Sequence, residues 1–347
     1  KAEIYNGDGM VLSARDEKKI DSIRREVSEA IAEQSRRGPD SSLRKLVYAE
    51  TDYETRSALE QRIIDFTLNS DYEHEYSGST DQLSRLWFDD GGAYAGDEAI
   101  FLDGYKVITD SLAVGLDIRL CHEVTAVRYS EKEGVTIETS QGVFTASAVI
   151  VTLPLGVLKA GNVRFVPPLP EKKQAAINQL GFGVLNKCCL LFPEAFWNTG
   201  LDWLQHLPRT GHAGEWAEWV SFARPTGKPM LMGFNAADVG TRIEGWSDEK
   251  IIQSAVSTLS TMFGKPVPTP LDAVITRWKS DPYARGSYSF NAVGSTPAQR
   301  DDLAKNISAR VFFAGEATDK KYYQTVHGAY QSGIRAADEI LKLNLRR

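Results

Sequence analysis

The sequence contains few cysteines, no long apolar run and no excess of positive charge. Its three cysteines, Cys121, Cys188 and Cys189, match no metal-ligand spacing, so we expect reduced, buried thiols and no metal site. The longest apolar run covers residues 148–155, far short of the roughly 20 residues that cross a bilayer. A net charge of −6 provides no basic footprint for nucleic acid and suits a cationic substrate.

A targeting signal is also absent, because the chain begins at Lys1 with neither a charged n-region nor an apolar h-region. The 347 residues, 42% hydrophobic and 25% charged, are typical of a soluble globular protein with two domains of roughly 100 to 200 residues each. We expect a soluble, cytoplasmic protein without a membrane segment, with localisation left open by whatever precedes Lys1.

The sequence lacks the strand, G-x-G-x-x-G turn and helix that normally bind a dinucleotide, with an acidic residue about 20 positions further on. The nearest glycine cluster is Gly91, Gly92 and Gly96. No apolar strand precedes it, so we expect a loop at this position.

Hydrophobic periodicity predicts how the chain is organised. Apolar residues at helical spacing, from Ile20 to Ile31, follow a Ser13 cap with Asp16 three residues on, so the first hundred residues are predicted to be helical. From residue 117 the period changes to two. The predicted strands cover residues 117–121, 124–129, 135–139, 143–146, 149–153 and 310–314, and further helices are predicted around residues 59–66, 172–179 and 325–341.

The strongest chemical signal lies near the C-terminus, in FFAGEAT (residues 312–318) and TVHGA (residues 325–329). A strand that ends in Gly315 and Glu316 lets backbone approach a ligand at the carboxyl end of a parallel sheet. A helix that begins at Thr325 or Val326 would point free N–H groups at a group that gains negative charge, such as a reduced flavin. A generic strand-turn-helix unit is the alternative.

These motifs resemble the C-terminal flavin signature of the flavin amine oxidases, the superfamily of polyamine oxidases and lysine-specific histone demethylases. Three further blocks are similar to that family: residues 151–159 with 165–170, residues 181–187, and residues 277–288. The resemblance implies a mixed α/β (α+β), two-lobed fold, with a partial FAD-binding domain and a substrate-binding domain of mixed sheet and helices. Residues 1–100 would be the helical part of the substrate domain and 156–275 its remainder. Residues 101–155 and 276–347 would belong to the FAD-binding domain.

The family's cofactor residues carry over position by position. The resemblance implies that the backbone of Val124 contacts the adenine and that Thr152 and Pro154 line the flavin. It implies that Glu316, Thr325 and Val326, next to Gly315, hold the ribityl and pyrimidine parts, and that Trp278 leans on the isoalloxazine edge. Ordinary packing is the alternative for Val124, Pro154 and Trp278. No cysteine lies near Tyr288 in the sequence, so non-covalent FAD is expected.

The substrate side is implied in the same way. Tyr288 would form one wall of an aromatic cage whose opposite wall, often Tyr in the family, is Thr325 here, which widens the entrance for bulkier amines. Glu73 would attract a distal ammonium of a polyamine, although a solvated charge run is the alternative. Lys187 is the catalytic candidate, because the family motif places it beneath the flavin with a water held against N5. A lysine at a strand end otherwise points into solvent.

The implied activity is FAD-dependent oxidation of a polyamine, or of another primary or secondary amine, to an imine, with O2 reduced to H2O2. The partners would be the amine, O2 and an upstream segment or partner chain that supplies the dinucleotide-binding motif. Two alternatives stay open. One is an L-amino acid oxidase, which would need an arginine such as Arg224, Arg242 or Arg285 to bind a carboxylate. The other is a flavin-free remnant that acts as an interaction module or as half of a split enzyme.

Overall fold

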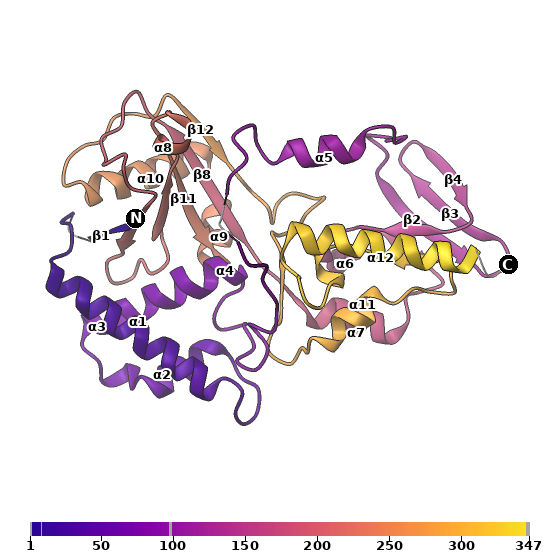
Figure 1. Cartoon of the computed structure of the whole chain (residues 1–347), viewed down its shortest axis with the longest axis horizontal. Coiled ribbons are helices and arrows are strands. Elements are labelled where there is room, and N and C mark those ends of the chain that lie inside the picture. Colours follow the sequence, from indigo (N-terminus) through magenta and orange to yellow (C-terminus); the bar gives the residue numbers. More distant parts are fainter. Residues whose placement is uncertain (1, 8, 97–98, 345–347) are drawn as a thin grey trace. The chain divides into compact units, whose positions relative to one another are not determined.

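Separate cores divide the chain into two units. The computed structural model describes residues 2–7, 9–96 and 99–344. Unit 1 comprises Lys1–Asp90 and Asn178–Pro297, and unit 2 comprises Gly91–Ile177 and Ala298–Arg347 (Figure 1). The predicted mixed α/β architecture is confirmed, while the domain divisions proposed near residues 100, 155 and 275 stay predictions.

Unit 1 combines a helical layer with a mixed sheet. Its helices are α1 (Ala14–Gln34), α2 (Leu43–Glu50), η1 (Tyr53–Thr55), α3 (Ala58–Thr67), the π-helix η2 (Leu68–Glu73), α4 (His74–Tyr76), α8 (Ala223–Thr226), α9 (Ala237–Glu244) and α10 (Asp248–Met262). Its strands are β1 (Ala2–Asn6), β7 (Gly181–Phe182), β8 (Leu185–Leu191), β9 (Trp203–Leu207), β10 (Glu218–Ser221), β11 (Met230–Ala236), β12 (Asp272–Ile275) and β13 (Ser289–Phe290).

Capping and apolar spacing explain the helical layer. The Ser13 hydroxyl accepts a hydrogen bond from the Asp16 N–H at 3.2 Å, which confirms the predicted cap. Ser57 forms a complete capping box with Glu60 at the start of α3. The apolar side of α1, from Ile20 to Ile31, is buried against α2 and α3 in one core cluster.

The large sheet of unit 1 has the strand order β1-β9-β10-β11-β8-β12. Strand β1 runs parallel to β9, whereas the other neighbours are antiparallel. One face buries apolar side chains such as Cys188, Leu204 and Trp219 against α10. The sequence pattern did not predict β1, because this short strand is stabilised by pairing with β9 roughly 200 residues further along the chain.

Unit 2 contains a meander and a parallel strand pair. Its helices are α5 (Lys106–Ala113), α6 (Leu155–Ala160), α7 (Glu171–Gln179, which ends at the unit boundary), α11 (Ala298–Ala304), η3 (Glu316–Thr318) and α12 (Val326–Asn344). Strands β2 (Val124–Ser130), β3 (Gly134–Thr139), β4 (Gly142–Ala146) and β6 (Arg164–Val166) form a sheet in the order β4-β3-β2-β6. Strands β5 (Val149–Val151) and β14 (Val311–Phe313) pair in parallel.

Packing on both sides buries β14, as predicted from its apolar sequence. Val311 and Phe313 join a core with β2 and β3, while Phe312 packs with Ala336 of α12 on the other side. Figure 1 shows α12 as the long yellow helix near the C-terminus. The predicted start of this helix at Thr325 or Val326 is confirmed.

Two sequence-based predictions are wrong. Residues 117–121 form no strand, and Ile118 and Leu120 are exposed, because no described strand pairs with this segment and isolated extended backbone gains no ladder hydrogen bonds. The cysteines are free, as predicted, but Cys121 is exposed instead of buried. Cys121 belongs to that unpaired segment, whereas Cys188 is buried inside β8. The glycine cluster at residues 91–96 is a loop, as expected.

Candidate functional site

In unit 2, the carboxyl ends of β5 and β14 place four predicted residues at one sheet edge. The register Phe313↔Val151 means that Thr152 and Pro154 follow one strand where Gly315 follows the other. Gly315 has φ 131°, which side chains of L-residues rarely adopt, and a Cβ built there would meet no atom within 4 Å. The edge is therefore open in front of Gly315, which lets a ligand approach the backbone.

Glu316 connects this edge to the start of α12. Its carboxylate accepts the Gln324 N–H at 2.7 Å, immediately before Thr325 and Val326. The Thr325 hydroxyl caps the helix by accepting the Gly328 N–H at 3.0 Å. Val326 is exposed, and the side-chain nitrogen of Gln324 is buried without a hydrogen-bond partner among the described residues. An unpaired side-chain donor thus lies next to the positive end of a 19-residue helix.

Arg300, which the sequence analysis did not single out, lies behind Glu316. Its guanidinium is fully buried and stacks 3.7 Å from the centre of the Tyr323 ring. Burial lowers the pKa of Arg300 to about 10, and the charge of Glu316 opposes this shift. Val124 lies elsewhere in unit 2, at the first position of β2, where its half-buried side chain packs on the β-sheet core.

In unit 1, Lys187 lies inside β8 and not at a solvated strand end. Its side chain is half-buried, and its ammonium is 5.9 Å from the centre of the Phe234 ring. Burial lowers the pKa of Lys187, with Cys189 opposing the shift. Among the described residues, no carboxylate forms an ion pair with it. The alternative of a lysine pointing freely into solvent does not describe this environment.

Trp278 is held against Asn186 of β8 by a buried polar network. The backbone N–H of Trp278 donates to the side-chain oxygen of Asn186 at 3.1 Å. The side-chain amide of Asn186 donates to the Glu244 carboxylate at 2.6 Å. Glu244 is buried and also accepts the N–H groups of Lys279 and Ser280. The indole of Trp278 itself is 38% exposed, so it is not an ordinary core tryptophan. Glu244 was missed because nothing in its local sequence signals a partner 58 residues away.

Tyr288 and Glu73 have partners within unit 1. The Tyr288 hydroxyl donates to the His74 carbonyl at 2.7 Å, and burial, followed by the charge of Glu75, raises its pKa. The Glu73 carboxylate is buried, not solvated, and accepts hydrogen bonds from Asn69 and Thr80 and an ion pair from Arg44 at 3.3 Å. Such complete pairing favours a structural role for Glu73, and its substrate contact stays a prediction.

Two of the three arginines considered for an amino-acid carboxylate form ion pairs within the chain. Arg224 pairs with Asp202, and Arg242 pairs with Glu215 at 2.7 Å. The backbone N–H of Arg285 donates to the Asp281 carbonyl within the loop that leads to Tyr288. These partners weaken the case for a carboxylate clamp at Arg224 or Arg242.

Comparison with known proteins identifies the family. A model of the flavin-containing amine oxidoreductases matches residues 14–341. The chain belongs to this family. It is 37% identical over 294 residues to the lysine-specific histone demethylase 1 homolog 1 of Oryza sativa subsp. japonica, covering 83% of this chain and 34% of that protein. It is 36% identical over 293 residues to human lysine-specific histone demethylase 2, covering 82% and 35%.

The solved structures include a redesigned putrescine oxidase that shares this fold, with a TM-score of 0.73 and 18% identity over 98% of this chain and 81% of that chain. The chain spans about a third of the length of the curated relatives it matches. The family and this neighbour imply FAD as the cofactor of this flavin amine oxidoreductase.

The residues of unit 2 fit part of such a cofactor. Open space before Gly315 admits a flat ring next to backbone, and the start of α12 offers donors to carbonyl oxygens. The sequence contains no glycine-rich turn for the pyrophosphate. This flavin amine oxidoreductase chain therefore holds the groups suited to the ring, without the turn that normally binds the phosphates.

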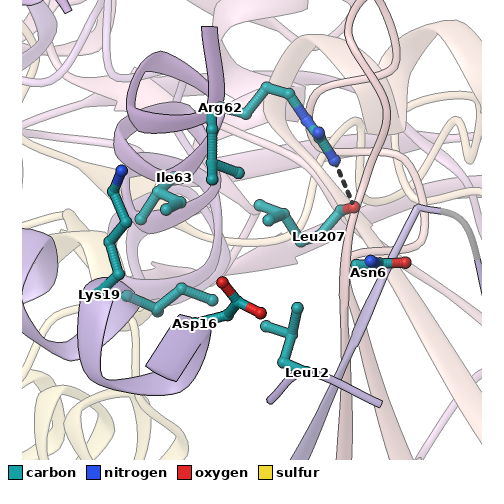
Figure 2. A pocket seen from close by; sticks show the side chains of 9 residues that line it. Asn6, Leu12, Asp16, Lys19, Arg62, Ile63 and Leu207 are labelled. Atoms are coloured by element: carbon teal, nitrogen blue, oxygen red, sulfur yellow. Dashed lines mark hydrogen bonds between the residues drawn. The ribbon is translucent and has the colours of Figure 1, made fainter. Parts of the chain in front are cut away.

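A cavity of about 300 Å³ lies elsewhere in unit 1, between α1, α3 and β9. Figure 2 shows Arg62 turned toward β9, where its guanidinium donates to the Leu207 carbonyl at 3.2 Å. Lys19 on its rim pairs with Glu60. None of the predicted flavin or amine residues lines this cavity, so we do not assign the family's chemistry to it.

Two kinds of feature are absent from the described ranges. Within residues 2–7, 9–96 and 99–344, no group of three or more His, Cys, Asp or Glu side chains is placed to hold a metal ion. In the same ranges, no helix has the length and apolar character needed to cross a membrane.

Proposed function

We propose that this chain carries the amine-oxidising centre of an FAD-dependent oxidase that converts a primary or secondary alkyl amine to an imine. The family match over residues 14–341, together with the desolvated Lys187, supports this proposal. When bound, FAD accepts a hydride equivalent from the amine α-carbon and transfers the electrons to O2, which gives H2O2. The imine is then hydrolysed by water.

The residues of unit 1 suit a cationic substrate. Asp71 and Glu218 interact electrostatically, and Glu75 lies near Tyr288. Acidic groups near an apolar, aromatic surface attract an ammonium and its alkyl chain. The desolvation of Lys187 supports a role in stabilising negative charge that develops on reduced oxygen, because desolvation strengthens the field of a protonated amine.

A polyamine is the substrate class we favour, and the side chain of an N-methylated lysine is the second candidate. The name of the putrescine oxidase neighbour supports the first, and the names of the demethylase relatives support the second. An amino acid is less well supported, because Arg224 and Arg242 already bind carboxylates of the chain.

The test combines an absorption spectrum with an amine panel. We expect the flavin-loaded protein to be bleached anaerobically by spermidine or putrescine and to form H2O2 when air is admitted. A methylated-lysine peptide and leucine complete the panel and separate the three substrate classes. A flavin spectrum that no amine bleaches would overturn the proposal. A folded protein that stays colourless when FAD and a glycine-rich segment are supplied would instead support the flavin-free remnant.

A further inference from the structure

One face of the large sheet in unit 1 carries a row of polar and aromatic side chains. Gln205 of β9 lies opposite Glu218 of β10, and Phe234 of β11 lies opposite Lys187 of β8. Because β10 and β11 pair with Trp219 opposite Gly233, the next position sets Glu218 beside Phe234. Side chains at directly opposite positions project from the same face of a sheet. Lys187 therefore shares its face with a glutamate two strands away.

His74 of α4 packs against this face. Its Nδ1 lies 2.7 Å from Oε2 of Glu218, and its ring centre is 6.0 Å from that of Phe234. The same Phe234 ring is 5.9 Å from the Lys187 ammonium. The backbone carbonyl of His74 accepts the Tyr288 hydroxyl at 2.7 Å. His74 thus binds the Tyr288 hydroxyl and lies near the same Phe234 ring as Lys187.

The other ring nitrogen of His74 lacks a partner. His74 is only 8% exposed, and its Nε2 is buried without a hydrogen bond to any described residue. Glu218 accepts the Gln205 amide on its other oxygen at 2.6 Å, so this carboxylate is oriented toward His74. A carboxylate on Nδ1 keeps the proton there and leaves the Nε2 lone pair free to accept another.

Three acidic side chains lie around His74 and Tyr288. Burial raises the pKa of Glu218, but the contributions of His74, the Gln205 hydrogen bond and the charge of Arg24 together outweigh burial, so the net pKa is lowered and Glu218 is a carboxylate. Asp71 of η2 also faces the pair and is itself paired with Arg24 of α1 at 3.5 Å. Glu75 lies by Tyr288.

Other nearby charges have their own partners. Glu73 is bound to Arg44, and the Lys187 ammonium lies 5.9 Å from the centre of the Phe234 ring.

We propose that His74, oriented by Glu218, accepts the ammonium proton of the amine substrate. This inference rests on the proposed function, in which only the free amine can release a hydride from its α-carbon. The proton moves from the substrate nitrogen to Nε2, and the substrate nitrogen keeps the electron pair that becomes the C=N π bond. The imidazolium is paired with the Glu218 carboxylate until its proton returns to solvent. His74 acts as a general base in this step.

The kinetic test uses the flavin-loaded protein and anaerobic flavin reduction by spermidine between pH 6 and 10. His74→Asn keeps a side-chain N–H for Glu218 and deletes Nε2. We expect at least a tenfold slower reduction at neutral pH. The difference in reduction rate between His74→Asn and the wild type should shrink as the pH approaches the amine's own pKa, about 10, because the amine then loses its proton to solvent. Glu218→Gln should shift the profile in the same direction with His74 intact.

The chain offers a matched control. Nδ1 of His212 lies 3.0 Å from Glu215, but that histidine is exposed. His212→Asn should leave the pH profile unchanged. A rate loss in His74→Asn that is equal at every pH would show a structural role and overturn the proposal, as would unchanged rates. If the pH dependence of the reduction rate flattens only in Lys187→Met, Lys187 is the base and the proposal is overturned.

A second measurement does not depend on turnover. Tert-butylamine has no hydrogen on its α-carbon and cannot be oxidised, so its ammonium is a probe of proton transfer alone. In protein labelled with 15N-histidine, this probe should protonate Nε2 of His74, a signal that is absent in His74→Asn. A resonance that ignores the probe would mean that Nε2 only holds a water and would overturn the inference. Protonation by the probe without oxidation of any amine would instead reject the proposed function alone.

Discussion

Lys187 differs from an ordinary surface lysine in what surrounds its ammonium. It lies on a strand within a six-stranded sheet, faces the Phe234 ring and forms no ion pair with the described residues. Burial lowers the pKa of Lys187, so folding leaves this amine poorly solvated. When it is protonated, such a group exerts its field on a ligand with little screening by water.

Lys187→Met should therefore leave the fold and any bound flavin in place while slowing flavin reduction or reoxidation at least tenfold, a barrier increase of about 1.4 kcal/mol. Stopped-flow spectroscopy of both half-reactions measures this. Lys250→Met is the control, because Lys250 is exposed and lies 4.1 Å from the Trp246 ring. Unchanged rates in both half-reactions would remove Lys187 from the mechanism.

The flavin should be released intact when the protein is denatured. The three cysteines lie at positions 121, 188 and 189, and none is in the loop of residues 277–288 that ends at Tyr288. A thioether to the flavin is therefore not expected there. Acid precipitation followed by absorption of the supernatant is the measurement, and yellow colour retained on the washed pellet would contradict the expectation.

His206 should make unit 1 sensitive to acid. It is buried on β9 with no partner for either ring nitrogen in the described chain, and burial, followed by Arg62 and Arg209, lowers its pKa to about 4. The unfolded chain, with a pKa near 6.5, then binds more protons between pH 4 and 6.5, so stability falls as the pH falls through this window. The loss from pH 7 to 5 amounts to about 2 kcal/mol.

His206→Leu should abolish that part of the acid sensitivity, measured as urea unfolding free energy at pH 7 and pH 5. His212→Leu, at an exposed histidine, should keep the wild-type slope. An identical pH dependence in His206→Leu and the wild type would show that His206 is not the group responsible.

At the scale of elements, α9 and the loop that follows β12 depend on each other. Glu244 ends α9, and its carboxylate accepts hydrogen bonds from Asn186 of β8 and from two loop N–H groups. Arg277 in turn donates to the Glu244 carbonyl at 3.2 Å. A helix end, a strand and a loop are thus joined by one buried carboxylate, which sets the position of Trp278.

Glu244→Gln should destabilise unit 1 by about 3 kcal/mol, because an amide nitrogen would then face buried donors. Urea unfolding with an unchanged m-value measures this. The fluorescence of Trp278, isolated by comparison with Trp278→Phe, should shift as the loop loosens. Glu249→Gln, an exposed position in the first turn of α10, is the control and should be neutral. A variant as stable as the wild type would show that the network contributes little.

At the scale of the whole molecule, this chain has groups suited to the flavin ring but lacks the glycine-rich turn that normally binds the phosphates. Unit 2 presents Gly315, Glu316 and the start of α12 at the end of a parallel strand pair. The pyrophosphate meets no glycine-rich helix N-terminus in this sequence. The need for an upstream segment or a partner chain that binds the phosphates stays a prediction.

The 347-residue chain alone should therefore bind FAD weakly, and addition or fusion of a βαβ segment with a glycine-rich turn should tighten binding at least tenfold. Fluorescence titration with FAD measures both cases. A segment whose turn glycines are replaced by leucine is the control. Tight, stoichiometric binding by the chain alone would contradict the expectation and would mean that other donors hold the phosphates.

Local signals in the sequence were enough for many elements of this protein. Ser13 and the spacing from Ile20 to Ile31 predicted α1, because a cap and an apolar stripe act within a few turns of helix. The apolar run before Gly315 predicted β14, and the motifs before and at the start of α12 indicated the family. Each of these features depends on residues that are neighbours along the chain.

Only the tertiary structure decided what depends on distant partners. Residues 117–121 have the alternation of a strand but no described neighbour to pair with, whereas β1 exists through its pairing with β9. In the sequence, Glu73 and Glu244 look like any other charged residue. Folding surrounds the carboxylates of both with hydrogen-bond donors. His74 acquires its contacts with Glu218 and Phe234 because the sheet register sets those strands side by side. Strand pairing and burial depend on residues that are distant in the chain. A local sequence pattern therefore cannot predict which distant strand will supply the partner.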